Sequence, residues 1–493
     1  MNGPPKACAA VSATDNAMVD ASRLRARIVG QFMHNRASMT RRTQEPDFLE
    51  NLQHELRDGR AWFDRAIVLS YAVSAGLVVV LFTMLAEWCF ELFLHINGTW
   101  RWGVLIWTPA VTMLIVWLTR SLAPGAAGSG IPQVMTALDP NLPGLARRHF
   151  VSLRLTLAKV VLSAAGLLAG LSLGREGPSV QVAAGIMHNA RRWIRPGSAL
   201  NEQALLVAGG AAGIAAAFNA PLAGVVFAIE ELARKIESRS SGLIIAAIVL
   251  AGLVSVSAFG NYSYFGSIKV PTLSWNSLAP SILVAVVCGL AGGLFSRLLL
   301  MSLTGAPSAL NRLRARFPVR FAGVGGLAIA IIGLSTGGAT FGAGGEEVRK
   351  MLVGESDVTQ LYALLKFMAT WITTWCGVPG GIFAPSLSIG AGIGNDIAQL
   401  VDAHMAAEMA PVLIAIGMAA FLAAVTQAPL TSFIIVMEMI DGRALVLTLM
   451  AAAMLASLLS RLVSRPLYAA MAEHMADPYV APDAKTGRPA STH

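Results

Sequence analysis

Apolar stretches separated by short polar segments recur along almost the whole chain. Seven of them are the clearest, and each is long enough to span a bilayer or nearly so, since a helical span takes about 20 residues. They cover residues 66–82, 103–118, 243–259, 282–295, 321–334, 409–425 and 444–459. Several are short or interrupted by Gly and Pro, which predicts broken and re-entrant helices that line a cavity. The pattern therefore predicts an all-α integral membrane protein.

Composition and charge agree with this interpretation. Of the 493 residues, 55% are hydrophobic and 13% are charged, against roughly 25% charged residues in a soluble protein. The formal charge of +9 (37 − 28) lies largely outside the apolar stretches. Arginines cluster between residues 23 and 42, which favours a cytoplasmic N-terminus in a multi-pass membrane protein. Later clusters at Arg147-Arg148 and Arg191-Arg192 leave the topology open, and no patterned basic domain indicates nucleic-acid binding.

The chain divides into a long membrane domain and two polar ends. Residues 1–62 contain no apolar core of a signal peptide, and we expect a cytoplasmic tail that ends in an amphipathic helix near 48–63. The transmembrane domain is expected over 63–475, followed by a polar tail over 476–493. The four cysteines have no metal-ligand spacing and imply no disulfide framework. With no cluster of catalytic residues or metal ligands, we expect neither enzyme activity nor a cofactor.

An internal repeat relates the two halves of the membrane domain, about 63–260 and 277–475. Residues 178–186 resemble 385–393, and residues 220–224 resemble 428–432. The offsets agree, at 207 (385 − 178) and 208 (429 − 221). Repeated halves with broken helices are typical of transporters, whose substrate site lies near the midplane where the halves meet. Whether the repeat is inverted or parallel stays open.

The repeat separates shared carboxylates from unshared ones. Glu230 and Glu438 each lie nine residues after the repeated proline (230 − 221 and 438 − 429), which indicates a structural role such as capping or pairing at a helix end. Glu231 corresponds to Met439, so it departs from the common scaffold and becomes a functional candidate. Because neighbouring side chains point about 100° apart on an α-helix, we expect Glu230 and Glu231 not to face the same pathway.

Three glycine-rich segments each lead into a proline and a predicted helix start. They are Gly128-Ser129-Gly130-Ile131-Pro132, Gly174-Arg175-Glu176-Gly177-Pro178 and Gly381-Ile382-Phe383-Ala384-Pro385. Glycine lets backbone amides approach a ligand, proline suits the first position of a helix, and a helix start binds anions. Three such starts pointed at one spot would hold an anion without a full positive charge. Glu176, whose counterpart in the repeat is Phe383, adds a carboxylate at membrane depth, which indicates a functional site.

On these three motifs, in this order and over most of the chain, the sequence resembles the CLC family of chloride channels and chloride/proton exchangers. The resemblance makes the three motifs a selectivity filter. It implies a homodimer with a separate anion pathway in each subunit, and a pseudo-two-fold repeat of roughly eighteen tilted, broken or re-entrant helices. The closest pattern is that of the bacterial form, which lacks soluble C-terminal regulatory domains.

The resemblance also assigns an anion site. It implies that Ser129 and Tyr468 offer hydroxyl groups to a central chloride, and that the backbone amides of Ile382 and Phe383 complete the shell. The resemblance also implies that a serine at position 129 favours chloride, where proline or methionine would indicate nitrate or fluoride.

For proton transfer, the resemblance implies that Glu176 is the external gate and Glu231 the internal proton-transfer residue. Two positions depart from the family pattern. Gln133 stands where an acidic residue often follows the first motif, and Met135 stands where another acidic residue can pair with a lysine. Lys159 still matches that lysine, and its partner is then expected to be Glu231 or water.

The resulting hypothesis is proton-coupled chloride exchange. Ionised Glu176 occupies the position of the anion, protonation releases it, and chloride then enters. Chloride and protons would be the transported ions, and membrane lipid the surroundings. The alternative is a passive, proton-gated chloride channel on the same scaffold, which Gln133 and Met135 favour and Glu231 disfavours. A membrane enzyme or a sodium-coupled carrier has no support in the motifs.

Each site residue also has a purely structural alternative. These alternatives are capping for Ser129, a cap paired with Arg175 for Glu176, a helix-end charge beside Arg234 and Lys235 for Glu231, and an interfacial aromatic for Tyr468.

Overall fold

The computed structural model describes residues 59–195, 200–232, 241–260, 265–266, 278–305, 307–355, 358–400 and 403–479. Contacts divide the chain into Met1–Phe63 and Asp64–His493, and the account below concerns the second unit. The expected N-terminal tail and most of the amphipathic helix lie outside the described residues, as does most of the expected C-terminal tail.

The described residues form nineteen α-helices and no strand beyond two isolated bridges, which confirms the all-α prediction. The first half contains α3 (Gly59–Thr99), α4 (Val104–Leu122), α5 (Ile131–Ala137), α6 (Gly144–Arg147), α7 (Leu153–Leu168), α8 (Glu176–Asn189), η3 (Ala190–Arg192), α9 (Glu202–Ala217), α10 (Pro221–Phe227), the π-helical turn η4 (Ala228–Leu232) and α11 (Ser241–Phe259). The second half contains α12 (Leu278–Leu303), α13 (Ala309–Arg316), α14 (Pro318–Ser335), α15 (Gly345–Val353), α16 (Tyr362–Trp375), α17 (Phe383–Leu400), α18 (Ala403–Thr426), α19 (Pro429–Met439), α20 (Val446–Val463) and α21 (Leu467–Ala476).

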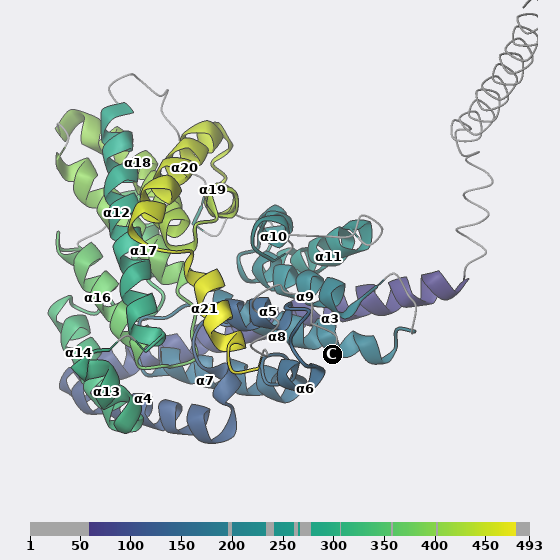
Figure 1. Ribbon diagram of the computed structural model, residues 1–493. Coiled ribbons are helices and arrows are strands. Elements are labelled where there is room, and N and C mark those ends of the chain that lie inside the picture. Colours follow the sequence, from purple (N-terminus) through teal and green to yellow (C-terminus); the bar gives the residue numbers. More distant parts are fainter. Residues whose placement is uncertain are drawn as a thin grey trace, which may run out of the picture. The chain divides into compact units, whose positions relative to one another are not determined.

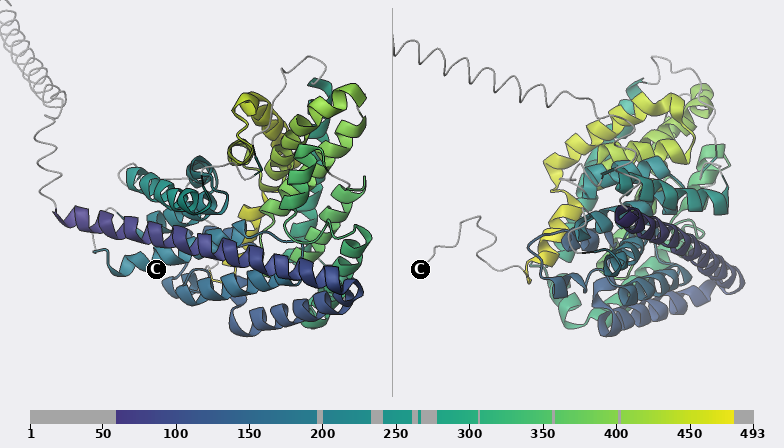
Figure 2. Two further views of the ribbon diagram at one scale, coloured as in Figure 1. Left: turned by 180° about the vertical axis from the view of Figure 1, so that it is seen from behind. Right: turned by 90° about the vertical axis from the view of Figure 1, so that its right-hand side faces the viewer.

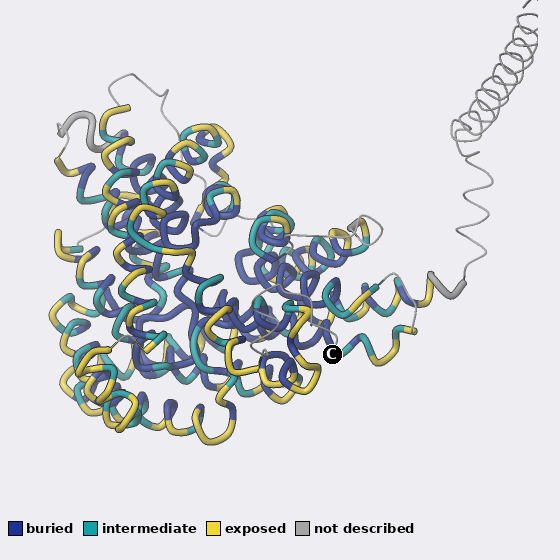
Figure 3. Tube along the Cα trace, in the orientation of Figure 1, coloured by how far each residue is buried: buried dark blue, intermediate teal, exposed yellow. Residues whose placement is uncertain are grey.

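Seven of the helical segments are long and apolar enough to cross a membrane, and each contains one of the seven predicted stretches. The chain is therefore a multi-pass membrane protein. In six of them 33% to 44% of the apolar window is buried, whereas 89% of the window Met409–Thr426 is buried. Helix α18 thus lies inside the helical array rather than at its edge, and Figure 3 shows buried backbone running through the middle of the array.

The two halves repeat the same order of helices. The loop-and-helix series α7, α8, α9, α10 of the first half corresponds to α16, α17, α18, α19 of the second, and α8 packs on α9 as α17 packs on α18. In Figure 1 the labels α8 to α11 lie together, apart from α12 and α16 to α20, and the rear view in Figure 2 keeps this separation. The internal repeat is therefore a repeat of structure as well as of sequence.

The shared carboxylates join the two halves reciprocally. Glu230 accepts hydrogen bonds from the backbone amides of Leu430 (3.0 Å) and Thr431 (2.6 Å), at the start of α19. Glu438 accepts from Leu222 (3.3 Å) and Ala223 (2.7 Å), at the start of α10. Each half thus caps a helix of the other, which confirms the structural role and is the contact pattern of a two-fold relation.

Candidate functional site

The three glycine-rich motifs meet at one point, where backbone hydrogen bonds tie them together. Gly174 and Gly381 exchange two bonds, from Gly174 N to Gly381 O (2.8 Å) and from Gly381 N to Gly174 O (2.7 Å). The first motif joins them through Gly380 N, which donates to Gly128 O (3.1 Å), and through Gly128 N, which donates to Val378 O (3.3 Å). The convergence predicted from sequence is therefore present in the structure.

A helix begins in each motif. Helix α5 begins at Ile131, α8 at Glu176 and α17 at Phe383. The expectation that proline takes the first helical position is wrong in detail, because Pro132 is the second residue of α5, and Pro178 and Pro385 are the third residues of α8 and α17. Proline is tolerated there because the first four amides of a helix have no intrahelical acceptor. The same unpartnered amides make each start a place of partial positive charge.

At two positions of these motifs, a polar side chain lies so close to the backbone that only glycine fits. A Cβ at Gly177 would lie 2.4 Å from Ser129 Oγ, and a Cβ at Gly174 would lie 2.2 Å from Glu176 Oε2. Both distances are below any tolerated contact, so a side chain at either position would displace the polar group that it meets. Glycine is therefore needed here to let two polar side chains sit against the backbone.

Ser129 and Tyr468 bring two hydroxyl groups side by side from separate parts of the chain. Ser129 is 4% exposed and Tyr468 is 1% exposed. The two hydroxyls lie near each other, but within the described residues neither has a partner with the distance and angle of a hydrogen bond. Tyr468 belongs to α21, which packs on α5, and its ring stacks on Phe383 with centroids 6.0 Å apart. Its burial excludes the interfacial-aromatic alternative, and the capping position of α5 is occupied by Gly130 rather than Ser129.

Glu176, the first residue of α8, is buried among the three helix starts. It is 2% exposed, and the backbone amides of Arg175 and Ala384 lie close to its carboxylate. In the part of the chain that the structure describes, its Oε2 atom has no hydrogen-bond partner. Arg175 forms an ion pair with Glu87 of α3 at 2.8 Å. The arginine thus braces the turn against α3.

Two buried side chains hold the loop that carries Ser129. Lys159 of α7 donates to Ala126 O (2.8 Å) and Gly128 O (2.6 Å). Gln133 accepts from Gly130 N (2.9 Å) through Oε1 and donates to Ala127 O through Nε2. The expected pairing of Lys159 with Glu231 is wrong, since the partners of Lys159 among the described residues are backbone carbonyls. Gln133 uses both ends of its amide, which an ionised carboxylate at this position could not do.

Sequence reasoning missed the counterpart of Lys159 in the second half. Lys366 of α16 lies 207 positions later (366 − 159) and is also fully buried. It donates to Thr340 O (3.0 Å) and Gly342 O (2.7 Å), in the loop before α15. Applying the repeat offset to Lys159 would have found it. Both halves therefore tie a glycine-rich loop to a buried lysine.

A cavity of about 760 Å³ opens beside the site and is lined by both Glu230 and Glu231. Both carboxylates therefore line one cavity, contrary to the expectation that they would not face the same pathway, and they lie on the π-helical turn η4. Glu230 is engaged in capping α19. Met135 lines the same cavity, and the carboxylates of Glu176 and Glu231 both act electrostatically on the Tyr468 hydroxyl. Tyr468 is thus close enough to both carboxylates that break the repeat for their charges to act on its hydroxyl.

Comparison with known proteins places this geometry in a family. The family model of voltage-gated chloride channels matches residues 111–461. The chain is 32% identical over 405 residues to the H(+)/Cl(-) exchange transporter ClcA of Citrobacter koseri, covering 78% of this chain and 82% of the relative. It is 31% identical over 353 residues to the protein of the same name from Cronobacter sakazakii, covering 69% and 73% of the two chains.

Solved structures share the fold. A slow cyanobacterial Cl−/H+ antiporter aligns with a TM-score of 0.71 at 24% identity, covering 86% of this chain and 99% of the other. A CLC-type fluoride/proton antiporter aligns with a TM-score of 0.67 at 21% identity, covering 87% and 99%. These identities are low, so the alignments establish the architecture, and the chemistry has to be argued from the residues of this chain.

Proposed function

The chain belongs to the voltage-gated chloride channel (CLC) family, and we propose that it exchanges chloride for protons across the membrane that it spans. Two relatives that it resembles over most of its length carry the name of H(+)/Cl(-) exchange transporters. In this proposal the three motifs form the selectivity filter, with Ser129, Tyr468 and the amides of Ile382 and Phe383 around the anion.

One observation carries the proposal. Ser129 Oγ, Tyr468 Oη and Glu176 Oε2 are buried polar atoms at the meeting point of three helix starts, and none has a hydrogen-bond partner among the described residues. An unpartnered buried polar atom costs about 1–3 kcal/mol. Hydroxyl donors and helix-start amides suit a small anion, since they bind it without a full positive charge and so let it leave again. Chloride between Ser129 and Tyr468 would satisfy both hydroxyls.

The mechanism is a competition between an internal and an external anion. Ionised Glu176 takes the position at the start of α8, beside the amides of Arg175 and Ala384. Protonation removes its charge, the helix starts no longer hold it, and chloride takes its place. When the carboxyl loses its proton again, it displaces the chloride. Proton occupancy of Glu176 thus decides when chloride can pass, and this links the two ions.

Glu231 is proposed to carry protons between Glu176 and the inner solution. Its carboxylate lines the cavity beside the site, which gives it access to water. Tyr468 lies within electrostatic range of both Glu231 and Glu176, so a proton moving between the carboxylates would pass near this hydroxyl. The neutral residues Gln133 and Met135 contribute no further titratable group to the route. The side of Glu231 would be cytoplasmic, with the N-terminus, in a homodimer of the cell inner membrane.

Reconstituted liposomes test this function directly. An outward chloride gradient is imposed, and chloride and proton movements are recorded together with ion-selective electrodes, in sodium and in a sodium-free buffer. Coupled exchange is expected to drive protons inward against their own gradient, without dependence on sodium. Chloride flux with no coupled proton movement would instead identify a passive channel and overturn the proposal.

A further inference from the structure

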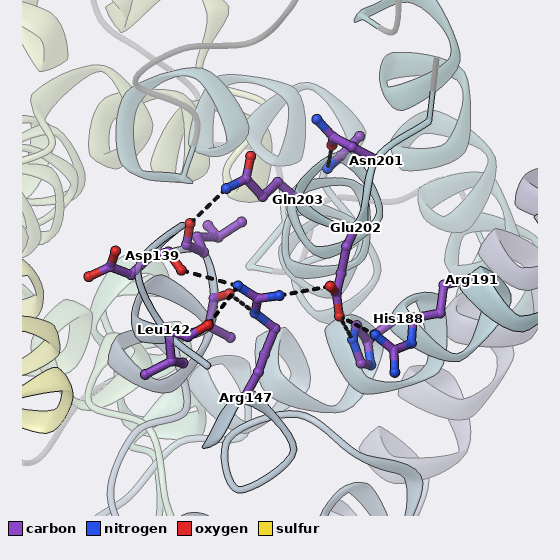
Figure 4. A network of polar contacts seen from close by, with 11 residues as sticks. Asp139, Leu142, Arg147, His188, Arg191, Asn201, Glu202 and Gln203 are labelled. Carbon is purple, nitrogen blue, oxygen red and sulfur yellow. Dashed lines mark hydrogen bonds and ion pairs between the residues drawn. The ribbon is translucent and has the colours of Figure 1, made fainter. Parts of the chain in front are cut away.

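An ion cluster at the start of α9 gathers four charged or titratable side chains from four segments (Figure 4). Glu202, the first residue of α9, accepts from Arg147 (2.7 Å, α6) and from Arg191 (2.7 Å, η3). The ring of His188, in the last turn of α8, contacts the same carboxylate. Arg147 and His188 are both buried, whereas Arg191 is about a third exposed. We call these four residues the Glu202 cluster.

Arg147 extends the cluster to the C-terminal end of α5. Its Nε donates to Ala137 O (2.8 Å), and its Nη2 donates to Asp139 O (3.2 Å) and Leu142 O (3.4 Å). Gln203 adds a bond to Leu138 O at 3.3 Å (Figure 4). The last carbonyls of a helix have no intrahelical donor, so these side chains satisfy acceptors that would otherwise be buried without a partner. The end of α5 is therefore fixed to Glu202 through one guanidinium group.

The two helices held by the cluster are two of the three that begin at the proposed anion site. Helix α5 begins two residues after Ser129 and ends at Ala137, whose carbonyl Arg147 binds. Helix α8 begins at Glu176 and carries His188 in its last turn. With a rise of 1.5 Å per residue, α5 is only about 10 Å long and α8 about 21 Å. Helices this short move as rigid rods, so a shift at the cluster is carried to Ser129 and Glu176.

We propose that the Glu202 cluster positions Ser129 and Glu176 relative to each other, and so sets chloride affinity and proton coupling. This inference rests on the proposed function of those two residues. Glu202, Arg147, Arg191 and His188 are positioning residues, since they act through the two helices and touch no transported ion. Arg147 and Arg191 therefore have a structural role as ion-pair partners of Glu202, in addition to any effect of their charge on membrane topology.

The charge balance makes the cluster sensitive to small changes. One carboxylate faces two guanidinium groups and an imidazole, so removing the carboxylate leaves partly buried cations without compensation, which is strongly unfavourable. The cations would then separate, and Arg147 would pull on the end of α5. Glu202→Gln removes the charge while keeping the size of the side chain, and it is therefore the main test.

The experiment measures the KM for chloride and the proton-to-chloride ratio in liposomes, and chloride binding to purified protein by calorimetry. For Glu202→Gln we expect a KM and a dissociation constant for chloride higher by on the order of tenfold, since small misplacements of active groups have large effects, together with a lower proton-to-chloride ratio. Asp441→Asn is the matched control, because it removes the carboxylate of an exposed ion pair with Arg443 and should leave both values unchanged.

Two further variants test the same inference if Glu202→Gln does not fold. Arg147→Lys keeps the charge but cannot reach the α5 carbonyls in the same way. Arg191→Gln alters the most exposed cation of the cluster, where folding is least at risk. Both should shift chloride affinity in the same direction as Glu202→Gln. Unchanged affinity and ratio in properly folded variants, with only yield or thermal stability reduced, would show a purely structural cluster and overturn the inference. If the wild type itself fails to couple protons, the proposed function fails, and the calorimetric comparison still decides the inference.

Discussion

Gly174 and Gly381 occupy equivalent positions in the two halves of the chain and bond to each other reciprocally. Their sequence separation is 207 (381 − 174), the offset of the repeat, and each amide donates to the carbonyl of the other at 2.8 and 2.7 Å. A reciprocal contact between equivalent residues lies on a two-fold axis. The pseudo-two-fold axis of this protein therefore passes between the second and third motifs, at the candidate site.

Glu176 lies close to this axis, so it can be compared directly with the equivalent residue of the other half. Two residues beyond each glycine, one half has Glu176 and the other has Phe383. The backbone is thus symmetric at the two glycines. The side chains two positions later differ, because one half has an ionisable carboxyl group and the other an aromatic ring. In the proposed function, the matching helix starts bind the anion at the repeat interface, and the one unshared carboxylate, Glu176, competes with it.

Glu176→Gln should abolish coupling and leave chloride flux that no longer depends on pH. The amide cannot carry a negative charge at any pH, so it cannot compete with chloride through titration. Proton and chloride movements recorded together in liposomes from about pH 3.5 to about pH 7.5, a range that brackets the ordinary carboxyl pKa of about 4.3, would measure this. Retained coupling in the variant would rule out the gate.

Glu231→Gln should stop proton movement while chloride still flows. The adjacent Glu230→Gln is the matched control, because both residues line one cavity but Glu230 caps α19. The control should keep its proton-to-chloride ratio and instead lose stability by about 1 kcal/mol, the usual size of a lost cap. Exchange assays and thermal unfolding in detergent separate the two effects. A normal ratio in Glu231→Gln would remove this residue from the proton route.

Glu438→Gln should reproduce the stability loss of Glu230→Gln. The two carboxylates make equivalent pairs of bonds to the starts of α10 and α19, so each loss is expected to be about 1 kcal/mol. The double variant should lose the sum, because the two caps are separate contacts and distant sites combine additively. Thermal unfolding of the three variants gives the comparison. A stability loss in only one single variant would contradict the reciprocal capping.

Much of this architecture could be predicted from sequence because it depends on local signals. All seven long apolar helices follow from hydropathy, and the motif order and the repeat pair Glu230 and Glu438 follow from alignment of the halves. The partners of Lys159 and Gln133 could not be predicted, because they are backbone groups whose positions depend on the folded loop. The Glu202 cluster joins four segments through side-chain geometry, for which the sequence carries no spacing rule.

Gly177→Ala should lower chloride affinity by displacing Ser129. The added Cβ would lie 2.4 Å from Ser129 Oγ, so the hydroxyl or the loop must move. Gly98→Ala is the control, because nothing lies within 4 Å of a Cβ at that glycine. Calorimetric titration with chloride should give weaker binding for the first variant and unchanged binding for the second. Equal chloride affinities in the two variants would show that Ser129 does not contribute to the anion site.

Gln133→Glu should make chloride affinity depend on pH. A protonated carboxyl can replace the amide, accepting from Gly130 N and donating to Ala127 O, so binding at low pH should approach that of the wild type. As pH rises above the carboxyl pKa, the ionised group faces the Ala127 carbonyl, loses the donated bond and repels the loop and the anion. Gln133→Met, similar in size but without hydrogen bonds, should bind chloride weakly at every pH. Titrations of the three proteins at several pH values would measure these curves, and a flat curve for Gln133→Glu would show that the amide does not hold the Ser129 loop.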